Sequence, residues 1–167
     1  MNPRGKLAAL VGMIALVAVL ASCASTNQGS ETIMDLQTAK GIAMAMEDEA
    51  AALVPPENVG DQTQLKTAHL LGCPDDQLKW SGRTTVTLLG DVDAEAMIDV
   101  IAAAWEQKDG VVVERRSTRQ GAPRVDMTGT QGDFYSASIW APGTELKITS
   151  FSPCFELEEG QHPSDAY

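Results

Sequence analysis

The chain holds few side chains that could act as acid or base catalysts near neutral pH. Histidine is the usual choice for that role, and the sequence has two, His69 and His162. His69 alternates with Leu65 and Leu71 along an expected strand, which favours a structural histidine on an apolar face. His162 falls in an acidic tail that we expect to be disordered. Since the Gly-x-Ser-x-Gly, phosphate-loop and His-x-x-Glu-His spacings are also missing, we predict a protein that is not an enzyme.

Acidic pairs are the next candidates, because carboxylate oxygens can bind calcium. Asp75 and Asp76 are adjacent, and Asp91 and Asp93 alternate. Calcium takes roughly six to eight oxygen ligands, and no complete ligand loop surrounds either pair. Asp91 and Asp93 also precede a helical pattern, where an acidic side chain can cap the helix N-terminus. We therefore predict neither a metal site nor a cofactor.

The residue whose chemistry the sequence specifies best is Cys23. It follows a leader with Arg4 and Lys6 near its start and an apolar run over 7–20, which is the organisation of a secretory signal peptide. The Leu-Ala-Ser-Cys motif that ends at Cys23 resembles the lipobox of bacterial lipoproteins. That resemblance implies that the Cys23 thiol carries diacylglycerol and that residues 1–22 are removed. The alternative is an ordinary secretory signal with an incidental cysteine.

A lipid on Cys23 would hold the protein on the extracytoplasmic face of the cell membrane. A single acyl chain holds a protein only marginally, whereas two or more chains anchor it stably. The apolar run over 7–20 is shorter than the roughly 20 residues that a spanning helix needs, so we expect no permanent transmembrane segment. Residues 23–31 are small and polar and should form a flexible tether between the lipid and the domain.

With Cys23 assigned to the lipid, Cys73 and Cys154 remain as a pair. An even number of cysteines in an oxidising compartment predicts a disulfide. The alternative is a reactive or redox pair. The two residues are far from a C-x-x-C spacing, however, and no neighbouring basic residue would activate a thiol. Structural bridging is the favoured interpretation, and it would close a loop of about 80 residues.

The net charge excludes one class of partner. It is −11 for the whole chain, and removal of residues 1–22 takes away Arg4 and Lys6 but no acid, which makes it −13. Nucleic-acid binding depends on Lys and Arg contacts to phosphates, so we expect no nucleic-acid partner. The same charge should keep the folded domain off an anionic lipid surface.

The elements that would position these residues form one domain over 32–157. Apolar residues at spacings of three and four predict helices over 33–53 and 93–108. Residues 158–167 are acidic and polar and are expected to form a disordered tail. Alternating residues predict five strands, over 64–71, 78–89, 111–118, 124–140 and 146–155. The strand over 124–140 is expected to be interrupted by a bulge near 129–132.

The expected fold class is therefore α+β, a single small domain in the order helix, two strands, helix, three strands. We predict an antiparallel-rich sheet with the helices on one face. One consequence of this order conflicts with the disulfide. If the strands over 78–89 and 111–118 are parallel, with the second helix as the crossover between them, and the last three strands form a meander, then the last strand ends at the opposite end of the sheet from the Cys73 turn. We give the disulfide precedence, since strand order is the weaker inference from sequence.

Aromatic and arginine side chains are the candidates for a binding surface. An exposed subset of the aromatic residues at strand ends would make a recognition patch, and the alternative is that they belong to the core. The arginines flank one predicted turn and could contact an anion, although charges are also common at solvated turns and edge strands. The aromatic residues are Trp80, Phe134, Tyr135 and Trp140, and the arginines are Arg115, Arg116, Arg119 and Arg124.

The order of motifs along the chain resembles a known family. After the lipobox come an Ala-rich helix, a cysteine before the central strand and an Asp-Ala-Glu helix start. The later runs are Val-Asp-Met-Thr-Gly at 125–129, Gly-Asp-Phe-Tyr at 132–135, Leu-Lys-Ile-Thr at 146–149 and Cys-Phe at 154–155. Together they resemble the LppA-type lipoproteins of mycobacteria and related actinobacteria. That family has no established activity, so the resemblance implies no catalytic residues, while its two later cysteines match Cys73 and Cys154 in order and support their pairing.

The sequence thus predicts a membrane-anchored extracytoplasmic lipoprotein that is a non-catalytic interaction or accessory module of the cell envelope. Its partners would be the membrane, through the lipid anchor, and an envelope protein or a lipid ligand. The contact surface would be the sheet or the hairpin that carries Arg115 and Arg124. The alternative is a carrier that binds a hydrophobic ligand between the sheet and the helices.

Overall fold

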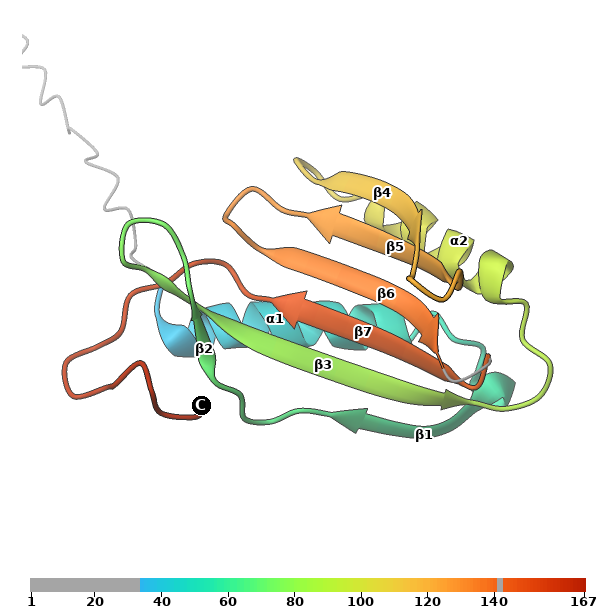
Figure 1. Ribbon diagram of the computed structural model, residues 1–167, viewed down its shortest axis with the longest axis horizontal. Helices are drawn as coiled ribbons and strands as arrows, with labels where there is room; N and C mark the ends of the chain where they lie inside the picture. Colours follow the sequence, from blue (N-terminus) through green and yellow to red (C-terminus); the bar gives the residue numbers. More distant parts are fainter. Residues whose placement is uncertain (1–33, 141–142) are drawn as a thin grey trace, which may run out of the picture. The chain divides into compact units, whose positions relative to one another are not determined.

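The computed structural model describes residues 34–140 and 143–167, so the leader, Cys23 and the tether lie outside the described residues. Figure 1 shows a curved sheet with the α-helices behind it. The elements in chain order are α1 (Leu36–Ala51), the short 3-10 helix η1 (Pro56–Asn58), β1 (Val59–Gln64), β2 (Leu70–Gly72), β3 (Leu78–Leu88), α2 (Ala94–Trp105), β4 (Val112–Ser117), β5 (Pro123–Thr128), β6 (Phe134–Trp140) and β7 (Glu145–Phe151).

The strands form one antiparallel sheet with the order β1-β3-β7-β6-β5-β4, and β2 pairs with the start of β3. Helix α1 packs against β3 and β7, whereas α2 packs against β4, β5 and β6. The predicted class, a single small α+β domain with an antiparallel sheet, is confirmed. Both helices share apolar contacts with the same face of the sheet.

Both helices begin at an aspartate that caps the N-terminus. The Asp35 carboxylate accepts a hydrogen bond from the Thr38 backbone N–H at 2.7 Å, and Asp93 accepts one from the Ala96 N–H at 3.1 Å. Such bonds satisfy donors that the first helical turn leaves free. The helical spacing predicted from the sequence is confirmed. Buried apolar residues recur every three or four positions along each helix: Leu36, Ala39, Ala43, Met46 and Ala50 on α1, and Met97, Ile101 and Trp105 on α2, where Ile98 and Ala102 are buried beside them.

The predicted strand over 124–140 is instead a hairpin of two strands, β5 and β6. Its turn is closed by the Gly129 N–H, which donates to the Asp133 carbonyl at 3.0 Å, and by Gln131 N–H, which donates to the Asp133 carboxylate at 3.1 Å. Gly132 has a φ of +76°, a conformation that glycine adopts at little cost. Both β5 and β6 place their odd-numbered residues on the helix side. Because the alternation continues in phase through the turn, the sequence pattern of the hairpin looks like that of one strand with a bulge, and the bulge prediction was wrong.

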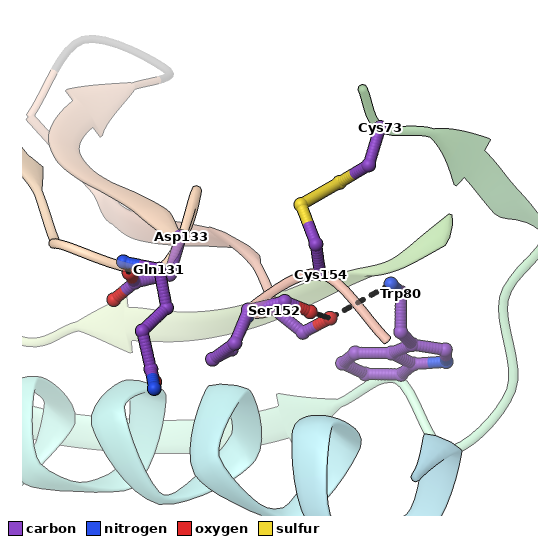
Figure 2. Close-up of a disulfide and its surroundings, with 7 residues drawn as sticks. Cys73, Trp80, Gln131, Asp133, Ser152 and Cys154 are labelled. Carbon is purple, nitrogen blue, oxygen red and sulfur yellow. Dashed lines mark hydrogen bonds between the residues drawn. A yellow bond between two sulfur atoms is a disulfide. The ribbon is translucent and has the colours of Figure 1, made fainter. Parts of the chain in front are cut away.

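The extra strand removes the conflict with the disulfide. Four antiparallel strands follow α2 instead of three, so β7 ends where β3 begins, with Phe151 opposite Ser81. Cys154 lies just after β7 and Cys73 just before β3, and the two form the predicted disulfide with a Cα–Cα distance of 6.1 Å. Figure 2 shows this bridge beside the turn that carries Gln131 and Asp133.

Two further expectations about the chain's course were wrong. The segment predicted as one strand over 64–71 is split, since β1 ends at Gln64 and β2 begins at Leu70. Residues 158–167 are not a disordered tail, because they pack back onto the domain. The Tyr167 N–H donates to the Ala68 carbonyl at 2.9 Å, and the Tyr167 carbonyl accepts from the Trp80 indole N–H at 2.7 Å.

Candidate ligand-binding face of the sheet

The sheet has one face covered by α1 and α2 and one face that the described residues leave open. Because successive side chains of a strand point to opposite faces, the residues of β6 and β7 divide between the two. On the open face lies a groove of about 400 Å³. Its lining residues come from four strands and are Arg83, Arg124, Phe134, Ser136, Ser138, Trp140, Lys147, Thr149 and Phe151.

The hollow exists because large side chains stand at its two ends and small ones lie between them. At one end Phe134 and Phe151 are cross-strand partners whose rings stack with centroids 5.9 Å apart. At the other end stands Trp140, which is 40% exposed. The floor between them consists of the small hydroxyl residues Ser136 and Ser138 of β6 and Thr149 of β7.

The groove is positively charged although the protein is acidic. Three cationic side chains line it, and the described residues contribute no carboxylate to the lining. Two of the cations are partly neutralised from outside it: Arg124 Nε lies 2.6 Å from Asp126, and Lys147 Nζ lies 3.2 Å from Glu145. Lys147 Nζ also lies 4.8 Å from the centre of the Trp140 ring, a cation–π distance.

Arg83 differs from the other two cations. Within residues 34–140 and 143–167, its guanidinium has no hydrogen bond, ion pair or aromatic ring contact. The strand pairing places Arg83 opposite Thr149, and Thr149 opposite Ser136. Neither hydroxyl has a hydrogen-bond partner in the described part of the chain, whereas the Ser138 hydroxyl accepts from the Trp140 indole N–H at 2.6 Å. One cross-strand row thus presents a guanidinium and two hydroxyls that have no partner in the described part of the chain.

Trp80 and Tyr135 do not belong to this surface. They are 0% and 1% exposed, so the prediction that places them on a binding surface was wrong and their alternative assignment to the core holds. Trp80 packs against α1, with Lys40 Nζ 5.3 Å from the centre of its ring. Tyr135 faces the helices, and burial raises the pKa of its hydroxyl. Of the four aromatic residues considered for a binding surface, Phe134 and Trp140 line the groove.

Arg115 and Arg116 are exposed but engaged in ion pairs. Arg115 bridges to Asp99 at 2.8 Å and Glu106 at 2.5 Å, which ties β4 to α2. These two carboxylates raise the pKa of Arg115, with the Asp99 hydrogen bond as the larger cause. Arg116 pairs with Glu114 at 2.7 Å and contacts Asp126 at 3.5 Å. Neither arginine lines the groove.

Six groove residues escaped the sequence analysis: Arg83, Ser136, Ser138, Lys147, Thr149 and Phe151. The signal that could have found them is the pattern of even-numbered residues in β6, where serines separate Phe134 from Trp140. A solvent-facing strand surface with bulky ends and a small polar middle implies a hollow. Which cationic side chains line that hollow depends on the order of the strands in the sheet, and the strand order was not predicted.

A second polar cluster lies in the core, around Glu47 of α1. This side chain is fully buried and accepts from Ser150 Oγ at 2.5 Å, Thr84 Oγ1 at 2.8 Å and Gln64 Nε2 at 3.3 Å. Gly82 makes the space, because a Cβ there would overlap the carboxylate. Burial raises the pKa of Glu47, and the three hydrogen bonds oppose that shift. The carboxylate has no access to solvent and is a structural group.

The described residues bring no catalytic or metal constellation together. His69 is exposed rather than part of an apolar face, and it makes a single bridge to Ala166. His162 contacts Ser164 at 2.7 Å within its own turn. Among residues 34–140 and 143–167, no group of three or more His, Cys, Asp or Glu side chains could hold a metal ion.

Comparison of the chain with protein-family models, with curated proteins and with solved structures finds no match. The resemblance to LppA-type lipoproteins therefore stays a prediction. In the part of the chain that the structure describes, no helix is both long and apolar enough to cross a membrane.

Proposed function

We propose that this protein is an extracytoplasmic lipoprotein, anchored through a lipid on Cys23, whose domain is a non-catalytic binding module of the cell envelope. The observation that carries the proposal is the groove on the open sheet face, where Arg83 has no partner among the described residues. Binding sites combine aromatic walls with a few convergent polar groups, and this groove has both.

The location rests on the leader and on the cysteine chemistry. Arg4, Lys6 and the apolar run precede the Leu-Ala-Ser-Cys motif at the depth of a lipoprotein signal. A disulfide between Cys73 and Cys154 suits a compartment where thiols are oxidised. The acidic domain would be repelled by an anionic membrane surface, so the tether would leave the groove free for a ligand.

A carrier with a ligand between sheet and helices is less well supported. The layer where such a ligand would sit is occupied by buried side chains from both, among them Met97, Ile101, Trp105, Met127 and Ile148. Proteins pack such layers at the density of organic crystals. The groove, which needs no rearrangement of this layer, is the better supported ligand site.

The anchor is tested by fractionating cells that express the Cys23→Ala variant. We expect the variant to leave the membrane fraction while its domain keeps the Cys73–Cys154 disulfide and a native circular dichroism spectrum. A Cys23→Ala protein that still sediments with membranes would show that another part of the chain is the anchor.

The binding face is tested by photo-crosslinking in intact cells. A photoreactive amino acid at Trp140 should give a defined adduct, because this side chain stands at the end of the groove. The matched control is the same amino acid at Val100, which is 49% exposed on α2. Adducts at position 100 alone, or the same adducts at both positions, would refute the open face as the binding surface.

A further inference from the structure

We propose that the groove binds an acidic oligosaccharide, a short chain of sugar rings that carry carboxylate or phosphate groups. This inference rests on the proposed function, since it takes the open sheet face as the binding surface. It adds the chemical class of the ligand, which follows from the charge, the lining and the shape of the groove.

The charge of the groove selects an anionic ligand. Arg83, Arg124 and Lys147 line it, without a carboxylate from any described residue, in a chain whose net charge is −11. Among the described residues Arg83 has no partner for its guanidinium donors, and these match the oxygens of a carboxylate or phosphate in geometry as well as in charge. An anion placed beside Arg83 would also meet the hydroxyls of Thr149 and Ser136, which lie in the same cross-strand row.

The lining favours sugar rings over acyl chains. A sugar ring has polar edges, which hydrogen-bond to hydroxyls, and an apolar C–H face, which packs on an aromatic ring. The groove offers hydroxyls on its floor and aromatic rings at its ends, namely the Phe134–Phe151 pair and Trp140. Among the described residues, no aliphatic side chain lines it. An acyl chain would therefore find apolar surface at the aromatic ends and only hydroxyls between them.

The position of the groove disfavours an extended peptide. Peptides that bind sheets do so mainly by adding a strand at an exposed edge, where backbone groups are free. The groove lies over β6 and β7, and each of these strands is paired on both sides. A peptide lying there would gain side-chain contacts without backbone pairing.

The length of the groove requires more than one sugar unit. Phe134 and Trp140 are the first and last residues of β6, and at about 3.4 Å per residue they lie roughly 20 Å apart along the strand. Aromatic contacts at both ends can be used together only by a ligand that spans this distance. A monosaccharide would reach the Arg83 row and one end at most.

The test is isothermal titration of the full-length lipoprotein, held in neutral detergent micelles, with a short oligogalacturonate. A neutral gluco-oligosaccharide of equal length is the matched ligand. We expect saturable binding of the acidic chain and at least about tenfold weaker binding of the neutral one, as loss of a charge-assisted hydrogen bond implies. Arg83→Gln should weaken oligogalacturonate binding at least about tenfold. Arg119→Gln is the matched control, because Arg119 is exposed outside the groove.

Three results would overturn the assignment: no binding of oligogalacturonate, equal loss with Arg83→Gln and Arg119→Gln, or equal binding of a polyglutamate peptide. Binding to vesicles of phosphatidylglycerol in place of the sugar acid would identify a lipid headgroup and would also overturn it. These failures are distinct from failure of the proposed function. If crosslinking from position 140 persists while oligogalacturonate does not bind, the binding face stands and the sugar-acid ligand is rejected.

Discussion

The two faces of this sheet are made by alternate residues of the same strands, yet one packs against the helices and the other carries an open groove. On β6, Ala137 and Ile139 face the helices and are buried among apolar side chains. Their neighbours Ser136 and Ser138 line the open groove. On the covered side the buried carboxylate of Glu47 is enclosed by three hydrogen bonds. The open face instead leaves Arg83 unpaired within the described residues, as we expect of a side chain that contacts a ligand under the proposed function.

Adjacent residues of β7 give the largest expected contrast between the faces. Ile148 is fully buried in the core cluster, and Ile148→Ala should lower the free energy of unfolding by about 2 to 5 kcal/mol, because it leaves a cavity. Thr149 lines the groove, so Thr149→Ala should change it by less than about 0.5 kcal/mol. Urea unfolding of both variants measures the difference, and equal losses would mean that the open face is also part of the core.

Gly82 tests how tightly the covered face is packed. A Cβ at this position would overlap Glu47, Trp80 and Ser150, so Gly82→Ala should cost about 1 to 3 kcal/mol through overpacking. Gly41 is the matched control, because it is exposed on α1 with open space around its Cβ position. Gly41→Ala should stabilise the protein by up to about 1 kcal/mol, since alanine favours a helix more than glycine. A Gly82→Ala variant as stable as the parent in thermal unfolding would contradict the packing of this cluster.

The buried carboxylate gives the covered face a pH dependence. The pKa of Glu47 is raised above its ordinary value of 4.5 by burial. Between that value and the raised pKa, the folded state holds a proton that the unfolded state has lost, so the free energy of unfolding falls as the pH rises. Below pH 4.5 both states are protonated and this effect is absent.

Glu47→Gln should remove the part of the fall in the free energy of unfolding with rising pH that is due to this carboxylate. Glu49→Gln, on the exposed side of the same helix, should retain it. Urea unfolding of the three proteins across this pH range gives the comparison. If the free energy of unfolding changes with pH in the same way for the parent and for Glu47→Gln, the carboxylate titrates alike in the folded and unfolded states.

The smallest expected effect on stability belongs to Arg83. Because its guanidinium has no partner among the described residues, Arg83→Gln should shift the free energy of unfolding by less than about 0.5 kcal/mol. The same variant should lose most of its ligand affinity. A loss of stability as large as that of Ile148→Ala would assign Arg83 to the fold instead.

Local patterns in the sequence were enough to predict the helices, the disulfide and the class of the fold. Spacing identifies α1 and α2, and Asp93 caps the latter as expected. The β5–β6 hairpin was missed because Val125, Met127, Tyr135 and Ala137 keep one alternation through the turn. The number of strands after α2 determines whether the last strand ends beside the start or beside the end of β3. Missing this one turn therefore also made the predicted topology wrong.

The groove could be predicted only in part for the same reason. Phe134, Trp140 and Arg124 were singled out by residue type, and all three line it. Arg83 and Lys147 come from β3 and β7, which are distant in sequence and become neighbours through non-local pairing. Trp80 and Tyr135 were misplaced because aromatic type does not reveal which face of a strand is buried. The tail was misjudged because its docking depends on single contacts such as that between Tyr167 and Trp80.

The most direct test of the division between the faces is to fill the groove without disturbing the core. Thr149→Trp places a large side chain on the groove floor beside Arg83 and Ser136. Crosslinking from a photoreactive residue at position 140 should then lose its adduct, while the unfolding midpoint in urea stays at the value of the parent. An undiminished adduct in a normally folded Thr149→Trp protein would contradict the open sheet face as the binding surface.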